Sequence, residues 1–165
     1  MRKAIISLLM AVAIVCTAIA ELPITKVDKI APTEEIFMDM AVSAAKKAKQ
    51  AKGLPCGAVI ILNNAFRSAG TADATATAEQ NAIAKAALPS LENAIIFTVN
   101  EPTTEAYNDI CRFGAESVVF VNGRDDVVAA GIYPASAYDD SKIDTTLTQV
   151  PLKQISFAEA ASLLK

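Results

Sequence analysis

The chain has 165 residues, of which 15 are basic, 18 are acidic and none is histidine. An acidic balance with scattered charges argues against a nucleic-acid partner, because such binding depends on Lys and Arg neutralising phosphates. The lack of histidine removes the commonest general base and metal ligand, together with any Ser–His or Cys–His nucleophile pair.

The first 20 residues are typical of a secretory signal peptide. Arg2 and Lys3 form a positively charged start, an apolar run follows, and residues 18–20 (Ala-Ile-Ala) offer a small-residue cleavage site. Because residues 4–20 are uncharged and approach the ~20 residues that span a bilayer, a membrane anchor is the alternative interpretation. The signal peptide is favoured, and it predicts a secreted or periplasmic protein that has no membrane contact after cleavage.

The remaining residues have the size of one domain with a hydrophobic core. We expect a polar lead-in over residues 21–31 and a single domain over residues 32–165. Two cysteines, Cys56 and Cys111, lie in this part. In an oxidising compartment they could form a disulfide, but unpaired cysteines are also among the most buried residues, and the sequence leaves both alternatives open.

Hydrophobic periodicity predicts alternating helices and strands along this domain. Apolar residues at helical spacing indicate helices, and short apolar runs bounded by turn residues indicate strands. The expected helices cover residues 32–52, 77–88, 103–113, 125–130 and 158–164, and the expected strands cover residues 57–62, 65–69, 94–99, 117–121 and 154–156. This order predicts an α/β fold, a three-layer α/β/α sandwich with a mixed central sheet.

Three stretches of the domain carry recognisable motifs. They are PCGAVI at residues 55–60, DATATAEQNAI at residues 73–83 and NEPTTEA at residues 100–106. In this order they resemble the Pro-Phe-Gly-Ala-Val, Asp-Pro-Thr-Ala-His-Ala-Glu-x-Asn-Ala-Ile and Cys-Glu-Pro-Cys-x-x-Cys motifs of the cytidine deaminase-like superfamily. The resemblance is closest to its guanine deaminase and adenosine deaminase branch, and it covers residues 36–164.

The resemblance implies a zinc ion held by one His and two Cys, with a nearby Glu that moves protons. Matching the motifs residue by residue places Thr77 at the His position, and Thr103 and Ala106 at the two Cys positions. Zinc is held by nitrogen, thiolate or carboxylate ligands, which none of these three residues supplies. We therefore expect no zinc and no other cofactor, although the family would imply zinc.

The proton-shuttle position of the motif is retained as Glu79. It would act as a residual catalytic acid or base, or as a first-turn glutamate that the helix N-terminus stabilises. The resemblance also implies a substrate pocket lined by Thr77, Asn81, Glu101 and Thr103, of which Asn81 and Glu101 equally suit turn and packing roles.

The leading hypothesis is an exported pseudoenzyme that binds a small nucleobase-like molecule or a protein partner, and the family resemblance admits a homodimer. The first alternative is an active nucleobase or nucleoside deaminase-like hydrolase that uses Glu79 as general acid and base. Such an enzyme could hold a metal through carboxylates, for which Asp73, Glu79, Glu101 and Glu105 are the candidates. The second alternative is a purely structural interaction protein.

Overall fold

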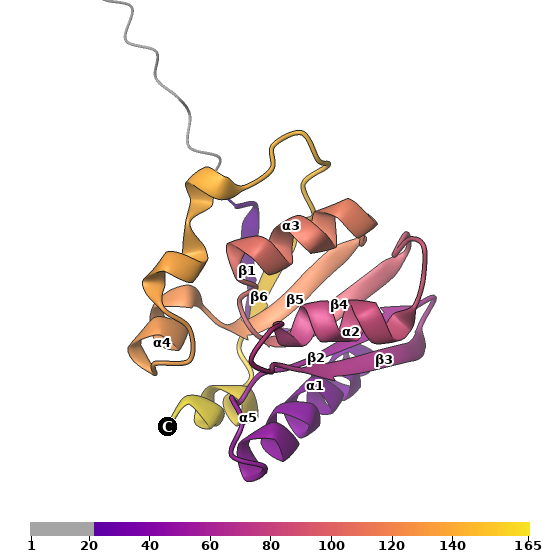
Figure 1. The fold of residues 1–165 in the computed structure, drawn as a ribbon. Helices are drawn as coiled ribbons and strands as arrows, with labels where there is room; N and C mark the ends of the chain where they lie inside the picture. The colour runs from indigo at the N-terminus through magenta and orange to yellow at the C-terminus, as the bar shows by residue number, and fades with distance from the viewer. Residues whose placement is uncertain (1–21) are drawn as a thin grey trace, which may run out of the picture.

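The computed structural model describes residues 22–165, which form a six-stranded sheet with helices on both faces (Figure 1). This arrangement confirms the expected α/β sandwich with a mixed central sheet. The proposed signal peptide lies outside the described residues. Within residues 22–165, no helix combines the length and the apolar character that a membrane span requires.

The sheet has the strand order β1-β6-β5-β4-β2-β3. The first four strands in this order are parallel to one another, and β2 pairs antiparallel with both β4 and β3. The strands are β1 (Ile24–Val27), β2 (Gly57–Leu62), β3 (Ala65–Thr71), β4 (Ala94–Asn100), β5 (Ser117–Asn122) and β6 (Leu152–Ile155).

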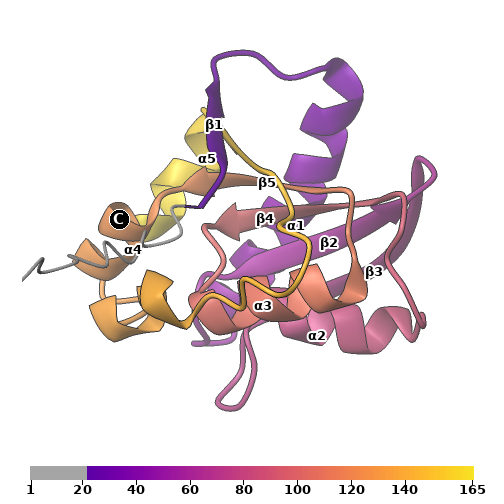
Figure 2. The same ribbon diagram turned by 90° about the horizontal axis from the view of Figure 1, so that it is seen from above.

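The helices divide between the two faces of the sheet, as Figure 2 shows from above. Helices α1 and α5 cover one face, and α2 and α3 cover the other. The helices are α1 (Pro32–Gln50), α2 (Ala78–Ala86), α3 (Thr104–Phe113), α4 (Arg124–Ala129) and α5 (Ala158–Ala161), with short 3₁₀ turns at Ala135–Tyr138, Asp140–Lys142 and Ser162–Leu164.

Strand β1 was not predicted, because we expected only a polar lead-in over residues 21–31. Three of its four residues are exposed, so the strand lacks the buried apolar alternation that identifies strands in sequence. It is instead an edge strand held by parallel pairing with β6, from Ile24 opposite Leu152 to Val27 opposite Ile155. Strand β6 also begins two residues earlier than expected.

The central strands are apolar along their whole length because helices cover both of their faces. In β2, Ala58 and Ile60 pack with α2 and α3, whereas Val59 and Ile61 pack on the α1 side. Strand β4 interrupts this pattern with Thr98 and Asn100, both of which are buried polar residues.

Strand β3 runs in close contact with α2. Ser68 Oγ donates a hydrogen bond to the backbone oxygen of Ala82, at 2.7 Å. A methyl group on Gly70 would overlap the backbone oxygen of Ala78 and the backbone nitrogen of Ala82. Glycine is therefore required at residue 70 for α2 to lie where it does.

We expect Gly70→Ala to lower the free energy of unfolding by about 3 kcal/mol or more, because backbone atoms on both sides would have to separate. Urea unfolding measures this loss. The matched control is Gly131→Ala, where the backbone is left-handed (φ +70°) but no atom lies within 4 Å of the added methyl group, and where we expect a loss of about 1 kcal/mol. Equal losses in the two variants would contradict the close contact.

Candidate functional site

The candidate site lies where helices α2 and α3 begin, next to the end of β4. Thr77 immediately precedes α2, Thr103 immediately precedes α3, and β4 ends at Asn100. The two helices are joined by a hydrogen bond from Gln80 Nε2 to Asp109 Oδ2, at 2.8 Å. The structure therefore brings the second and third sequence motifs together.

Glu79 is buried in the first turn of α2, with only 4% of its surface exposed. Its carboxylate accepts a hydrogen bond from the hydroxyl of Thr98 on β4. Burial raises the pKa of Glu79 above its usual 4.5, and the nearby hydroxyls of Thr98 and Thr77 oppose this shift. The side chain therefore points into the protein and not to solvent, unlike that of a surface first-turn glutamate.

Thr77 and Thr103 both serve as helix N-caps. Thr77 Oγ1 accepts from the backbone nitrogen of Gln80 at 3.3 Å, and the Gln80 side chain accepts from the Thr77 backbone at 3.0 Å. Thr103 Oγ1 accepts from the backbone nitrogen of Ala106 at 3.3 Å, and Ala106 is completely buried. Each hydroxyl thus satisfies a helix-end amide that would otherwise lack a partner.

Cys56 contributes a buried thiol from the turn before β2. Asn100 Nδ2 donates to its sulfur at 3.2 Å, and burial raises the pKa of the Cys56 thiol to about 11. The hydroxyl of Tyr133 is buried next to this thiol and near Glu79. Both Cys56 and Cys111 are free thiols, so the disulfide alternative is not formed.

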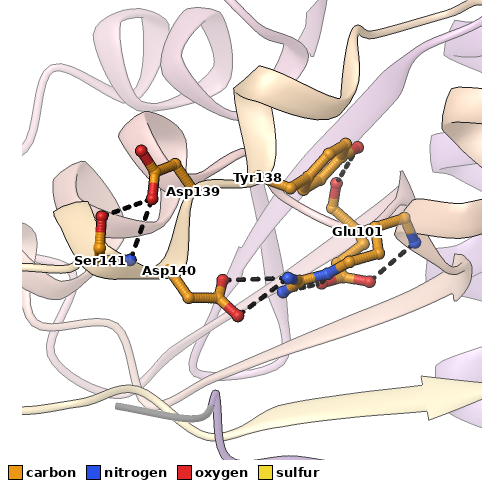
Figure 3. Close-up of polar contacts among 6 residues, drawn as sticks. Glu101, Tyr138, Asp139, Asp140 and Ser141 are labelled. Atoms are coloured by element: carbon orange, nitrogen blue, oxygen red, sulfur yellow. Dashed lines mark hydrogen bonds and ion pairs between the residues drawn. The ribbon is translucent and has the colours of Figure 1, made fainter. Parts of the chain in front are cut away.

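Glu101 is the centre of a second buried network, drawn in Figure 3. Its carboxylate lies 2.7 Å from Arg124 Nη2 and accepts from the Arg124 backbone nitrogen at 2.8 Å. The same guanidinium contacts Asp140 at 3.0 Å, and Tyr138 Oη donates to the Glu101 backbone oxygen at 3.2 Å. Glu101 therefore anchors the segment after α4 rather than facing the space between α2 and α3.

Asn81 holds the loop before α2. Its Nδ2 donates to the backbone oxygen of Thr71 at 2.9 Å and to Asp73 Oδ2 at 2.8 Å. Hydrogen bonds from Thr75 and Asn81 lower the pKa of Asp73, which is exposed. Asn81 and Asp73 thus shape this loop and do not join Glu79.

The four candidate carboxylates do not gather into a metal site. Glu79 is bonded to Thr98 and Glu101 to Arg124. Across residues 22–165, no three His, Cys, Asp or Glu side chains lie close enough to hold a metal ion together. The residues at the matched ligand positions do not fit a zinc ion either, since two are capping threonines and the third is an alanine.

One buried residue that contacts Glu79, Thr98, was missed in the sequence. It could have been found as a polar residue inside an apolar strand. Cys56, which lies in the first sequence motif, and the half-buried Tyr133 also lie near Glu79. A surface cavity of about 360 Å³ lies beside Thr103. Glu105, Asn108 and Asp139 also line this cavity.

The sequence of this chain matches one known protein family. Residues 32–122 match the family model of the cytidine and deoxycytidylate deaminase zinc-binding region. A search among curated proteins found no match.

Solved deaminase structures are similar over most of the chain. A guanine deaminase from Bacillus subtilis is 28% identical, with a TM-score of 0.59, over 78% of this chain and 88% of that chain. A guanine deaminase from Nitrosomonas europaea is 19% identical, with a TM-score of 0.62, over 84% and 85%. A structure from a study of A-to-I editing by tRNA:A34 deaminases is 20% identical, with a TM-score of 0.61, over 74% and 98%. At such identities the last two show the fold alone.

We expect Glu79→Gln to remove a pH-dependent loss of stability. Between pH 4.5 and the raised pKa, the folded protein keeps a proton that the unfolded chain has released, so wild-type stability falls as the pH rises through this window. The variant cannot titrate here, and its stability relative to wild type should rise by about 1.4 kcal/mol per pH unit within the window. Urea unfolding from pH 4 to pH 8 measures this. Glu105→Gln, at an exposed position of α3, is the control, and the same trend in both variants would contradict the assignment.

We expect Arg124→Leu to destabilise the protein by about 3–5 kcal/mol, because it leaves the buried Glu101 carboxylate without its partner. Arg112→Leu, which breaks an exposed ion pair with Asp109, should cost about 1 kcal/mol or less. Thermal or urea unfolding of both variants compares them. Losses of similar size would show that the Glu101 pair contributes no more than a surface pair.

Proposed function

Because the chain belongs to the cytidine and deoxycytidylate deaminase family, near its guanine deaminases, we propose that it is an exported member that has lost the catalytic zinc site. In this proposal the fold binds a small nucleobase-like molecule or a protein partner without chemical turnover. The signal-peptide pattern of the first 20 residues supports export.

The proposal rests on the residues at the three matched ligand positions, which cap helices or pack in the core and do not bind a metal. The hydroxyls of Thr77 and Thr103 accept backbone hydrogen bonds at the starts of α2 and α3. Ala106 is buried, and its methyl side chain has no atom that could bind a metal. A catalytic zinc takes three protein ligands and a water molecule, so replacing all three leaves no activated water for attack on a base.

The environment of Glu79 supports the same proposal. As a general base it would have to be ionised and would have to reach a water molecule near a substrate. Burial instead favours its neutral form, and its carboxylate is engaged by the hydroxyl of Thr98. The side chain therefore suits a hydrogen-bonding role inside the protein.

One observation favours the alternative of an active hydrolase with a rebuilt site. A buried glutamate with a raised pKa is what a general acid requires near neutral pH, and Glu79 stands at the position that the family uses for proton transfer. In this alternative Glu79→Gln would abolish turnover while the protein remained folded.

We expect the purified mature protein, residues 21–165, to carry no stoichiometric zinc and to release no ammonia from guanine, cytidine or adenosine. Metal analysis and a coupled ammonia assay measure the two quantities. Stoichiometric zinc together with ammonia release would overturn the proposal. Ammonia release without zinc, lost in Glu79→Gln, would establish the alternative instead.

The matched ligand positions are tested by restoring the ligands. The triple variant Thr77→His, Thr103→Cys, Ala106→Cys should acquire stoichiometric zinc, because imidazole and thiolates would then meet at the starts of α2 and α3. The control is Thr77→His alone, which supplies one ligand and should remain without zinc. If a folded triple variant still lacks zinc, these three positions do not form the vacated site.

A further inference from the structure

A separate cavity of about 340 Å³ lies at the carboxyl ends of three parallel strands. It is lined by the last residues of β1, β5 and β6, namely Val27, Asn122 and Ile155, and by the segment that leads into α5. Its volume is at the lower end of the range for small-molecule sites. Neither Glu79 nor the capping threonines of the deaminase site line it.

The topology of the sheet forms this cavity. After β5 the chain crosses to the face covered by α2 and α3, where Ile132 and Val150 pack. After β6 it crosses to the opposite face, where Ala160 and Leu163 pack with α1. The two neighbouring strands therefore send their chains to opposite sides, and a crevice opens between their carboxyl ends. In open α/β sheets such switch points are the usual place for ligands.

Two amide side chains give this crevice a defined polarity. Asn122, which is 97% buried, donates its Nδ2 to Asn100 Oδ1 at 3.0 Å and to the Ala160 backbone oxygen at 3.3 Å. Gln154 donates its Nε2 to the Val121 backbone oxygen at 3.1 Å. Because these partners are all acceptors, the orientation of both amides is fixed. Their carbonyl oxygens have no hydrogen-bond partner within residues 22–165, and both residues line the cavity, so we infer that each amide can supply it with an acceptor.

The charged residues around the cavity add to this preference. Asp28 and Asp126 line it together with a single cation, Lys26, and none of the three forms an ion pair within the described part of the chain. The remaining wall is largely apolar, with Val27, Ile155 and Phe157 among its residues. The cavity therefore combines a surplus of hydrogen-bond acceptors with an apolar surface.

We propose that this cavity binds a small aliphatic amine. Its ammonium group donates to the oxygens of Asn122, Gln154 and Asp126, and its alkyl chain lies on the apolar wall. An ammonium group carries only donors, which matches acceptors whose own donors are already used. A bare metal ion fits less well, because no three carboxylates or other strong ligands converge there. The proposal does not depend on the loss of zinc at the deaminase site.

The test is a titration of the mature protein with n-butylamine at pH 7 and low salt, followed by the side-chain amide NMR signals of Asn122 and Gln154. We expect both signals to shift and to saturate. The same titration with n-butanol, which has the same length but no charge, should produce much smaller shifts. Butyrate and calcium chloride complete the comparison.

The matched variants are Asp126→Asn and Asp125→Asn. Both remove one exposed acidic charge from the first turn of α4, but only Asp126 lines this cavity. We expect Asp126→Asn to weaken butylamine binding by about tenfold or more, as for the loss of a hydrogen bond between charged groups, and Asp125→Asn to change it little.

Several results would overturn the proposal. Shifts that do not saturate, or equal shifts with butanol, would show that no ammonium site exists. Stronger binding of butyrate would make Lys26 the dominant group, and stronger binding of calcium would make the cavity a metal site. Equal losses in the two aspartate variants would reduce the effect to the general charge of the protein.

Discussion

The end of strand β4 carries buried polar groups that must all find partners, and the arrangement of the surrounding elements follows from this requirement. Burying an unpaired polar group is costly, so each one fixes the position of whatever satisfies it. Thr98 engages Glu79 at the start of α2, and Asn100 contacts Cys56 and the neighbouring Asn122. Glu101 engages Arg124 after β5. Three polar residues at and just after the end of one strand thus connect helices, turns and strands from distant parts of the domain.

The same region shows how the starts of α2 and α3 are stabilised by groups of the protein itself. In the family, a metal ion bound by side chains would link the starts of α2 and α3. Here each start is stabilised by its own threonine cap, and a hydrogen bond from Gln80 to Asp109 in the middle of α3 joins the two helices. Threonine performs the capping task because its hydroxyl reaches the free amides of the first turn. In the proposed function, threonine caps at these positions would preserve local helix stability without the zinc chemistry of the family.

Much of this fold could be predicted from the sequence, because its central strands and long helices carry strong periodic patterns. The family also followed from motif order, which depends on several short matches in register. Strand β1 could not be predicted, since an exposed edge strand is defined by its partner β6 and not by its own composition. At the site, the positions of Thr77, Glu79 and Thr103 followed from the motifs. The partners of Glu79 and Glu101 did not, because Thr98 and Arg124 approach them from distant parts of the chain.

The pairing of β1 with β6 also has a consequence for biosynthesis. Residues 24–27 pair with residues 152–155, so the first strand to be synthesised waits for the last. Contacts over such long sequence separations form late, because closing the intervening chain costs entropy before the contact returns any stability. On the ribosome this edge of the sheet stays open until nearly the whole chain has emerged.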